Sequence, residues 1–230
     1  MDQLAAAVYT SSYHPDEHRN ADGKRARAYE RQLSFLEQHI TDYSPSLLDI
    51  GCGAGAFLRF ARDRGWEIGG TDVVVTDAAR QSGADLWQGE LPNIQFGDAR
   101  FCVIRFNHVL EHTQDPLKEL CRARNLITDD GILFIAVPNI GGLSIRLKSW
   151  QSRLGLKAKR WKHYGALHHL WFFTPATLIK LVHAAGFDVV HWETPVSDQV
   201  GRAAWARAAV RWPLAAARIG GTLELYASPR

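Results

Sequence analysis

The sequence predicts an α/β fold in which helices cover both faces of a parallel sheet. The first observation is the stretch 47–58, where a short apolar run breaks into three glycines at alternate positions and then opens a helical pattern. The second is that strand-like and helix-like segments alternate along most of the chain, as they do in parallel sheets. The third is size, because 230 residues with 46% hydrophobic content suit one globular domain over residues 1–230.

The elements follow in a regular order. Residues 1–44 form a lead-in whose helix, over 24–40, places Tyr29, Leu33, Leu36 and Ile40 at helical spacing. Apolar runs bounded by turn residues predict strands over 47–50, 66–71, 84–88, 101–106, 131–137, 187–192 and 222–227. Helices are predicted over 57–65, 76–81, 115–126, 143–156 and 175–185, and Gly65 is expected to stop the first of them.

Two kinds of nucleotide cofactor fit the glycine turn. Gly51, Gly53 and Ala56 satisfy a dinucleotide fingerprint, and Asp72 lies where that fingerprint places a ribose-binding acid. Asp49 stands two residues before the first glycine and would repel a pyrophosphate by about 1 kcal/mol or more. S-adenosyl-L-methionine instead brings an ammonium and a sulfonium, so Asp49 favours it over NAD.

Short motifs follow one another in a fixed order along residues 45–195. They are LDIGCGAG from Leu48, Gly70-Thr71-Asp72, Gly89-Glu90-Leu91, Val109-Leu110-Glu111-His112 with Asp115-Pro116, Pro138-Asn139, His169-Leu170 and Ala185-Gly186-Phe187. As a set they resemble class I S-adenosylmethionine-dependent methyltransferases, of the ubiquinone-biosynthesis O-methyltransferase type and related small-molecule enzymes. The resemblance implies a Rossmann-like, seven-stranded sheet in the order 3-2-1-4-5-7-6, with strand 7 antiparallel.

The resemblance also implies a cofactor site at the ends of the first four strands. Asp49 would bind the methionine amino group, Asp72 the two ribose hydroxyls, and Glu90 the adenine amino group. The residues that we expect at the cofactor are Asp49, Gly51, Cys52, Gly53, Gly55, Asp72, Val73, Glu90, Leu91, Asn107, His108 and His112.

The catalytic residues are harder to assign from sequence. Methyl transfer from a sulfonium depends mainly on alignment of donor and acceptor, and a base is needed only where the acceptor atom carries a proton. Histidine titrates near neutrality and suits that task. We expect the base among His163, His168 and His169, where relatives place acceptor-facing elements. We expect no metal site, since His168 and His169 are adjacent and the cysteines are scattered.

Arg105 is unusual because it falls inside a predicted central strand. A guanidinium there is always charged and needs a partner. Either the side chain reaches the cleft and binds an acceptor carboxylate or phosphate, or it pairs with an acid such as Glu111. Of these two roles, pairing with an acid is slightly favoured.

Charge is unevenly divided along the chain. Residues 1–130 hold 14 Lys+Arg and 20 Asp+Glu, whereas residues 131–230 hold 13 and 4, and no acid lies between Asp130 and Asp188. The basic amphipathic pattern over 143–156 belongs to a predicted lid or insert at about 140–168, and Trp205 and Trp212 share a face in an arginine-rich segment. Such asymmetry indicates either an anionic partner or a solvated basic face.

These observations together predict a methyltransferase that uses S-adenosyl-L-methionine and acts on a small-molecule acceptor, most readily at oxygen. A lipid-linked or phosphate-bearing acceptor and peripheral contact with an anionic membrane would account for the basic segments. An RNA methyltransferase is the alternative, although no RNA-binding motif accompanies the basic residues; an NAD-dependent oxidoreductase and a non-catalytic binding module are weaker ones. The N-terminus lacks a signal-peptide pattern, so we expect a cytoplasmic protein. The sequence does not specify an oligomeric state.

Overall fold

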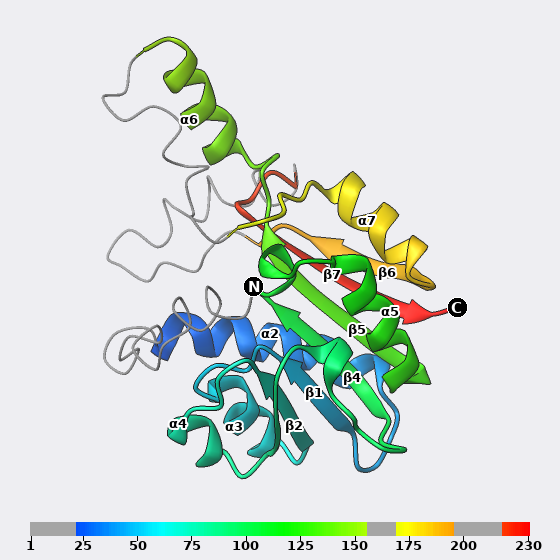
Figure 1. Cartoon of the computed structure of the whole chain (residues 1–230). Coiled ribbons are helices and arrows are strands. Elements are labelled where there is room, and N and C mark those ends of the chain that lie inside the picture. Colours follow the sequence, from blue (N-terminus) through cyan, green and yellow to red (C-terminus); the bar gives the residue numbers. More distant parts are fainter. Residues whose placement is uncertain (1–21, 156–168, 196–217) are drawn as a thin grey trace.

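The computed structural model of the chain describes residues 22–155, 169–195 and 218–230, and its centre is one seven-stranded sheet (Figure 1). The strands are β1 Ser46–Ile50, β2 Glu67–Asp72, β3 Asp85–Gln88, β4 Phe101–Asn107, β5 Ile127–Pro138, β6 Phe187–Glu193 and β7 Thr222–Pro229. Their order is β3-β2-β1-β4-β5-β7-β6. The pairs from β3 to β5 are parallel, and β7 runs antiparallel to both β5 and β6. The predicted order and the antiparallel seventh strand are confirmed.

Helices cover both faces of the sheet, as the alternating pattern predicts (Figure 1). The helices of the described residues are α2 Asp22–His39, α3 Ala56–Arg62, α4 Asp77–Arg80, α5 Pro116–Leu126, α6 Leu143–Arg153 and α7 Pro175–Ala184, with short 3-10 turns η2 Leu91–Asn93 and η3 Leu110–His112. Leu33 and Leu36 of α2 join Phe57 and Leu58 of α3 in the core on one face. Residues of α5 and α7, such as Leu120 and Leu178, fill the core on the other.

Local signals set the helix ends much as expected. The regular part of α3 ends at Arg62, and the chain then turns at Gly65, whose φ is +87°. The Trp66 N–H reaches back to the Ala61 carbonyl at 3.2 Å, which closes the helix in the manner of a glycine stop. Asp115 caps α5 by accepting from the Leu117 and Lys118 N–H groups. The stop after α3 leads the chain into β2, and the Asp115 cap ends the loop that follows β4 at the carboxyl edge of the sheet.

The fifth strand is longer than predicted, since it begins at Ile127 rather than Gly131. Phe101 pairs with Ile127 and Val103 with Ile132, so the β4 and β5 register shifts between them. A Cβ at Gly131 would lie 2.8 Å from the Cys102 carbonyl oxygen, so the shift places the two backbones too close for any other residue. Turn-like residues in 128–131 concealed this strand start from the sequence pattern.

The helix α6 projects away from the sheet (Figure 1). Four apolar side chains of this segment, Leu143, Leu147, Trp150 and Leu154, are 44–56% exposed. The helix agrees with the amphipathic pattern predicted for this stretch. His163, His168, Trp205 and Trp212 lie outside the described residues, as do the first 21 residues. Among the described residues, no helix has the length and apolar character needed to cross a membrane.

Candidate functional site

The glycine turn joins β1 to α3 at the carboxyl edge of the sheet. Gly51 and Gly53 adopt φ values of +67° and +57°, a conformation that other residues rarely take. A Cβ at Gly51 would also lie 2.5 Å from Cγ2 of Val109, so Gly51 is needed for packing as well as for its backbone angle. The turn therefore has little freedom to accept substitutions at these positions.

Asp72 ends β2 and lies against this turn. One carboxylate oxygen accepts the Gly53 N–H at 2.9 Å, and the other accepts the Val74 N–H at 3.2 Å. A carboxylate offers about four lone-pair sites, so two acceptor positions are left. Asp72 can thus hold the turn and still accept two further donors, which fits the ribose role expected for it.

The other predicted adenosine residues surround the same edge. Val73 is 37% exposed directly after Asp72, whereas Leu91 is fully buried at the start of η2. The Gly89 N–H donates to the Asp72 carbonyl at 2.9 Å, which brings the Glu90 segment beside β2. Burial, followed by the charges of Asp49 and Asp72, raises the pKa of the Cys52 thiol far above its usual value. Cys52 is therefore a protonated packing residue of the turn.

Arg105 pairs with Asp49 rather than with Glu111. The two residues face each other in the register of β4 and β1, and the Arg105 Nη1–H donates to Asp49 Oδ1 at 2.7 Å. Their side chains are 4% and 3% exposed. Burial raises the pKa of the Asp49 carboxyl, and the charge and hydrogen bond of Arg105 oppose that rise.

This pairing changes the role that sequence suggested for Asp49. Its carboxylate lies on the sheet face covered by α2 and α3, where its charge is already compensated by Arg105. Asp49 therefore has no uncompensated charge with which to select a cationic cofactor over NAD. Arg105 also does not reach an acceptor from this buried position, which removes the first of its two predicted roles.

A chain of hydrogen bonds continues from Arg105 across the molecule. Arg105 Nη2–H donates to Gln32 Oε1 at 3.2 Å, and Gln32 Nε2–H donates to Glu224 Oε1 at 3.0 Å. Arg31 donates to both Glu224 oxygens at 2.7 Å and to Glu193 at 3.0 Å. The glycine turn is thereby linked through α2 to β7.

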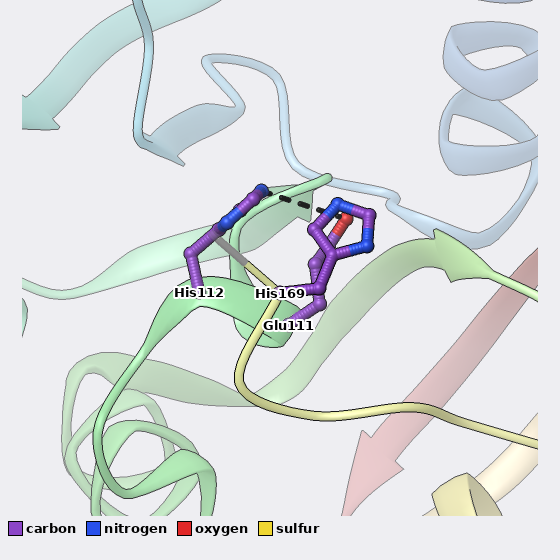
Figure 2. A group of neighbouring side chains, drawn as sticks. All are labelled: Glu111, His112 and His169. Carbon is purple, nitrogen blue, oxygen red and sulfur yellow. Dashed lines mark ion pairs between the residues drawn. The ribbon is translucent and has the colours of Figure 1, made fainter. Parts of the chain in front are cut away.

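A second group of side chains lies where β4 ends. His108 has a φ of +57°, and its Nδ1 lies 3.3 Å from Oε1 of Glu111. Nε2 of His112 lies 4.0 Å from the same oxygen, and the His112 and His169 rings meet edge to face at 4.8 Å. Glu111 is 1% exposed, and its Oε2 has no hydrogen-bond partner among the described residues. Figure 2 shows Glu111, His112 and His169 gathered around one point.

The position of His169 depends on the segment that follows it. The Leu170 and Trp171 N–H groups both donate to the Glu111 carbonyl, at 2.8 and 3.1 Å. The Trp171 indole N–H donates to the Thr113 carbonyl at 3.0 Å. Phe173 then forms a bridge with Asn139 at the end of β5. Hydrogen bonds thus join residues 170–171 to residues 111–113, beside the histidines.

The three residues in Figure 2 also have the composition of a metal site. Each offers one ligand atom, and these atoms lie within 4.8 Å of one another. Tetrahedral zinc ligands at bonds of about 2.0 Å lie roughly 3.3 Å apart, so the side chains would have to close in slightly around an ion. Neighbours in sequence do not reveal this group, because residues 112 and 169 meet only in the folded chain, and the absence of a metal site stays a prediction.

Most of the predicted site residues meet at one edge of the sheet. Asp72, the glycine turn, Leu91, Asn107 and His108 all lie at or just beyond the carboxyl ends of β1 to β4. His169 joins them, while His163 and His168 lie outside the described residues. Glu111 was foreseen only as a partner for Arg105, yet its buried carboxylate contacts two histidines. The spacing of His108, Glu111 and His112 was the available signal for this cluster.

A family model described as "Methyltransferase domain" matches residues 21–192 of the chain. The ubiquinone biosynthesis O-methyltransferase of Azorhizobium caulinodans is 31% identical over 173 residues, covering 71% of this chain and 66% of the relative. That of Idiomarina loihiensis is 27% identical over 171 residues, covering 68% of each. The chain therefore spans about two thirds of the length of these relatives.

The fold also resembles solved structures. The magnesium protoporphyrin IX methyltransferase of Synechocystis PCC 6803, determined with bound SAH, superposes with a TM-score of 0.63 over 100% of both chains. Its sequence identity to this chain is 14%, so the likeness concerns the fold alone.

Proposed function

Because this chain belongs to the methyltransferase domain family and is a methyltransferase dependent on S-adenosyl-L-methionine, we propose that it methylates an oxygen atom of a small-molecule acceptor. The observation that carries this proposal is the cluster of His108, Glu111, His112 and His169 beside the cofactor turn. A hydroxyl acceptor must lose its proton, and this cluster supplies bases together with a buried carboxylate to orient them. The names of the curated relatives agree with an oxygen acceptor.

The residues at the glycine turn fit the cofactor. Bound S-adenosylmethionine supplies a methyl group already activated by its sulfonium charge. Asp72 keeps acceptor capacity for the ribose hydroxyls, and Glu90 with the Leu91 N–H is available to the adenine. The left-handed turn would bring backbone close to the cofactor, and Asn107 and His108 at the end of β4 would lie near its methionine part.

We assign proton removal to the histidine cluster. Glu111 lies 3.3 Å from Nδ1 of His108, so it would fix that ring with Nε2 directed outward, where an acceptor proton could be taken up. His112 and His169 stand within reach of the same carboxylate, and either ring could take the proton if the acceptor lies on their side. A carboxylate that orients an imidazole base in this way is common in hydrolytic and transfer enzymes.

The acceptor is proposed to be largely apolar. Leu170, Trp171 and Phe172 follow His169 and are 40–59% exposed. Exposed apolar side chains next to polar catalytic groups are typical of small-molecule sites. The basic, apolar helix α6 would serve an acceptor that is lipid-linked or carries a phosphate, and would place the enzyme against an anionic membrane.

The test is formation of S-adenosylhomocysteine from S-adenosylmethionine with a panel of acceptors. We expect turnover with an apolar catechol and none with the matching amine or with RNA. Methylation of RNA would instead support the alternative of an RNA methyltransferase. Asp72→Ala should weaken cofactor binding at least tenfold, because two ribose hydrogen bonds are lost. Glu111→Gln should lower kcat about a hundredfold while cofactor binding stays close to normal.

Two controls decide what the cluster does. Glu90 is exposed and is assigned to the adenine rather than to proton removal. Glu90→Gln should therefore change cofactor affinity without the loss of kcat expected for Glu111→Gln. Activity that survives a strong chelator supports histidine bases acting alone. Activity that disappears with the chelator and returns with a divalent cation would mean that Glu111, His112 and His169 hold a metal ion.

A further inference from the structure

Arg105 stands directly beneath the cofactor turn and carries a charge that the reaction does not use. Its partner Asp49 precedes Gly51 by two residues, and a 2.7 Å distance is typical of a hydrogen bond between two charged groups. Both side chains are almost fully buried, so solvent screens their charges little. Any change in either charge therefore changes the electrostatic potential at the glycine turn.

The surroundings of Arg105 hold its charge in place. The guanidinium carbon lies 3.8 Å from the Phe57 ring centroid, and the rings of Phe134 and Tyr29 lie 5.6 and 5.8 Å away. Gln32 accepts from Nη2, while Nε has no hydrogen-bond partner among the described residues. Aromatic faces and a neutral amide attract the cation, but only Asp49 among its described contacts carries an opposite charge.

The two forms of the cofactor differ by one charge at the same atom. S-adenosylmethionine carries a sulfonium, and S-adenosylhomocysteine carries a neutral thioether, whereas the ammonium and carboxylate are common to both. A lone carboxylate under the turn would bind the cationic form more tightly than the neutral one. A carboxylate paired with a guanidinium gives almost no such preference.

We propose that Arg105 sets how strongly the site distinguishes S-adenosylmethionine from S-adenosylhomocysteine, because its guanidinium cancels the charge of Asp49. This inference rests on the use of S-adenosylmethionine by the chain. Arg105 thereby acts as a specificity-determining residue without touching the cofactor. Any preference that remains would then come from Asp72 and the other polar groups at the carboxyl ends of β1 to β4.

The inference is tested by calorimetric measurement of Kd for both compounds in a charge cycle. The quantity compared is the ratio of the Kd for S-adenosylhomocysteine to the Kd for S-adenosylmethionine. Asp49→Asn leaves Arg105 uncompensated, so the ratio should fall by about threefold to thirtyfold, as one charge roughly 10 Å away would cause. Arg105→Gln should raise it when the measurement is made at alkaline pH, because burial raises the pKa of Asp49 and the carboxyl without its guanidinium partner takes up a proton near neutral pH. The double variant, and Arg105→Lys, should return to within about twofold of the wild type.

A purely structural role would change both Kd values together and leave their ratio constant. Gln32→Leu is the matched control, because it removes a hydrogen bond to Arg105 without changing any charge. A ratio unchanged in both single variants overturns the inference, as does a double variant that behaves like Asp49→Asn. If Arg105→Gln does not fold, the comparison of Asp49→Asn with the double variant decides. A wild type that binds neither compound overturns the assigned cofactor itself.

Discussion

Glu119 on α5 is a residue whose burial couples stability to pH. Burial raises the pKa of its carboxyl to about 7, and the nearby charges of Glu90 and Asp115 add to the rise. The folded protein then keeps a proton that the unfolded chain releases near pH 4.5. Stability from this group is present below pH 4.5 and is lost as pH rises through 7.

Glu119→Gln should therefore stabilise the protein at pH 8 by about 1 to 3 kcal/mol and have little effect at pH 4.5. The measurement is urea unfolding at the two pH values. Asp98→Asn, a change of an exposed acid, is the control and should have no such pH dependence. Equal effects of Glu119→Gln at both pH values would contradict the raised pKa.

Sequence could identify single residues only where a local pattern specified them. The glycine turn and Asp72 were predicted because their spacing carries the chemistry of nucleotide binding. The partner of Arg105 was not, since Asp49 becomes its neighbour only through the register of β1 and β4, 56 residues apart. The contact of His169 with His112 likewise depends on backbone bonds to Glu111 that no spacing reveals.

The helix α6 is the element whose function is most open to test. Its apolar side chains are exposed, while Arg146, Lys148 and Arg153 supply positive charge. We expect the protein to bind vesicles containing phosphatidylglycerol and to release them at high salt. Leu147→Ser with Trp150→Ser should weaken that binding at least tenfold, because burial of each side chain contributes about 1.5 to 3 kcal/mol.

Leu117→Ser on α5 is the matched control, since it changes an exposed leucine away from α6. Equal binding to neutral and anionic vesicles, or no effect of the α6 changes, would contradict a membrane role. Cofactor affinity should be unchanged in all these variants, which separates docking from folding.

At the scale of the whole molecule, the order of the strands was predictable, but the hydrogen bonds between side chains from distant parts of the chain were not. The sheet order was predicted from the resemblance to class I methyltransferases alone, because the motifs mark strand ends along the chain but do not say which strands are neighbours. The path from the glycine turn through Arg105, Gln32 and Glu224 depends instead on side chains from four elements meeting beneath the sheet. Such a network is invisible to periodicity, which reports only which face of an element is apolar.

That network makes Glu224 a test of how the N-terminal helix is held. Glu224 is 4% exposed and bonds both Arg31 and Gln32, whereas Glu193 and Arg31 form a pair whose side chains are 35% and 34% exposed. Glu224→Gln should lower the free energy of unfolding by about 1 to 3 kcal/mol, because it removes a charged partner from buried donors. Glu193→Gln should cost less than about 1 kcal/mol. Urea unfolding compares the two. Equal small losses would mean that α2 docks through its leucines alone, and that the link from β7 to the glycine turn carries no stability.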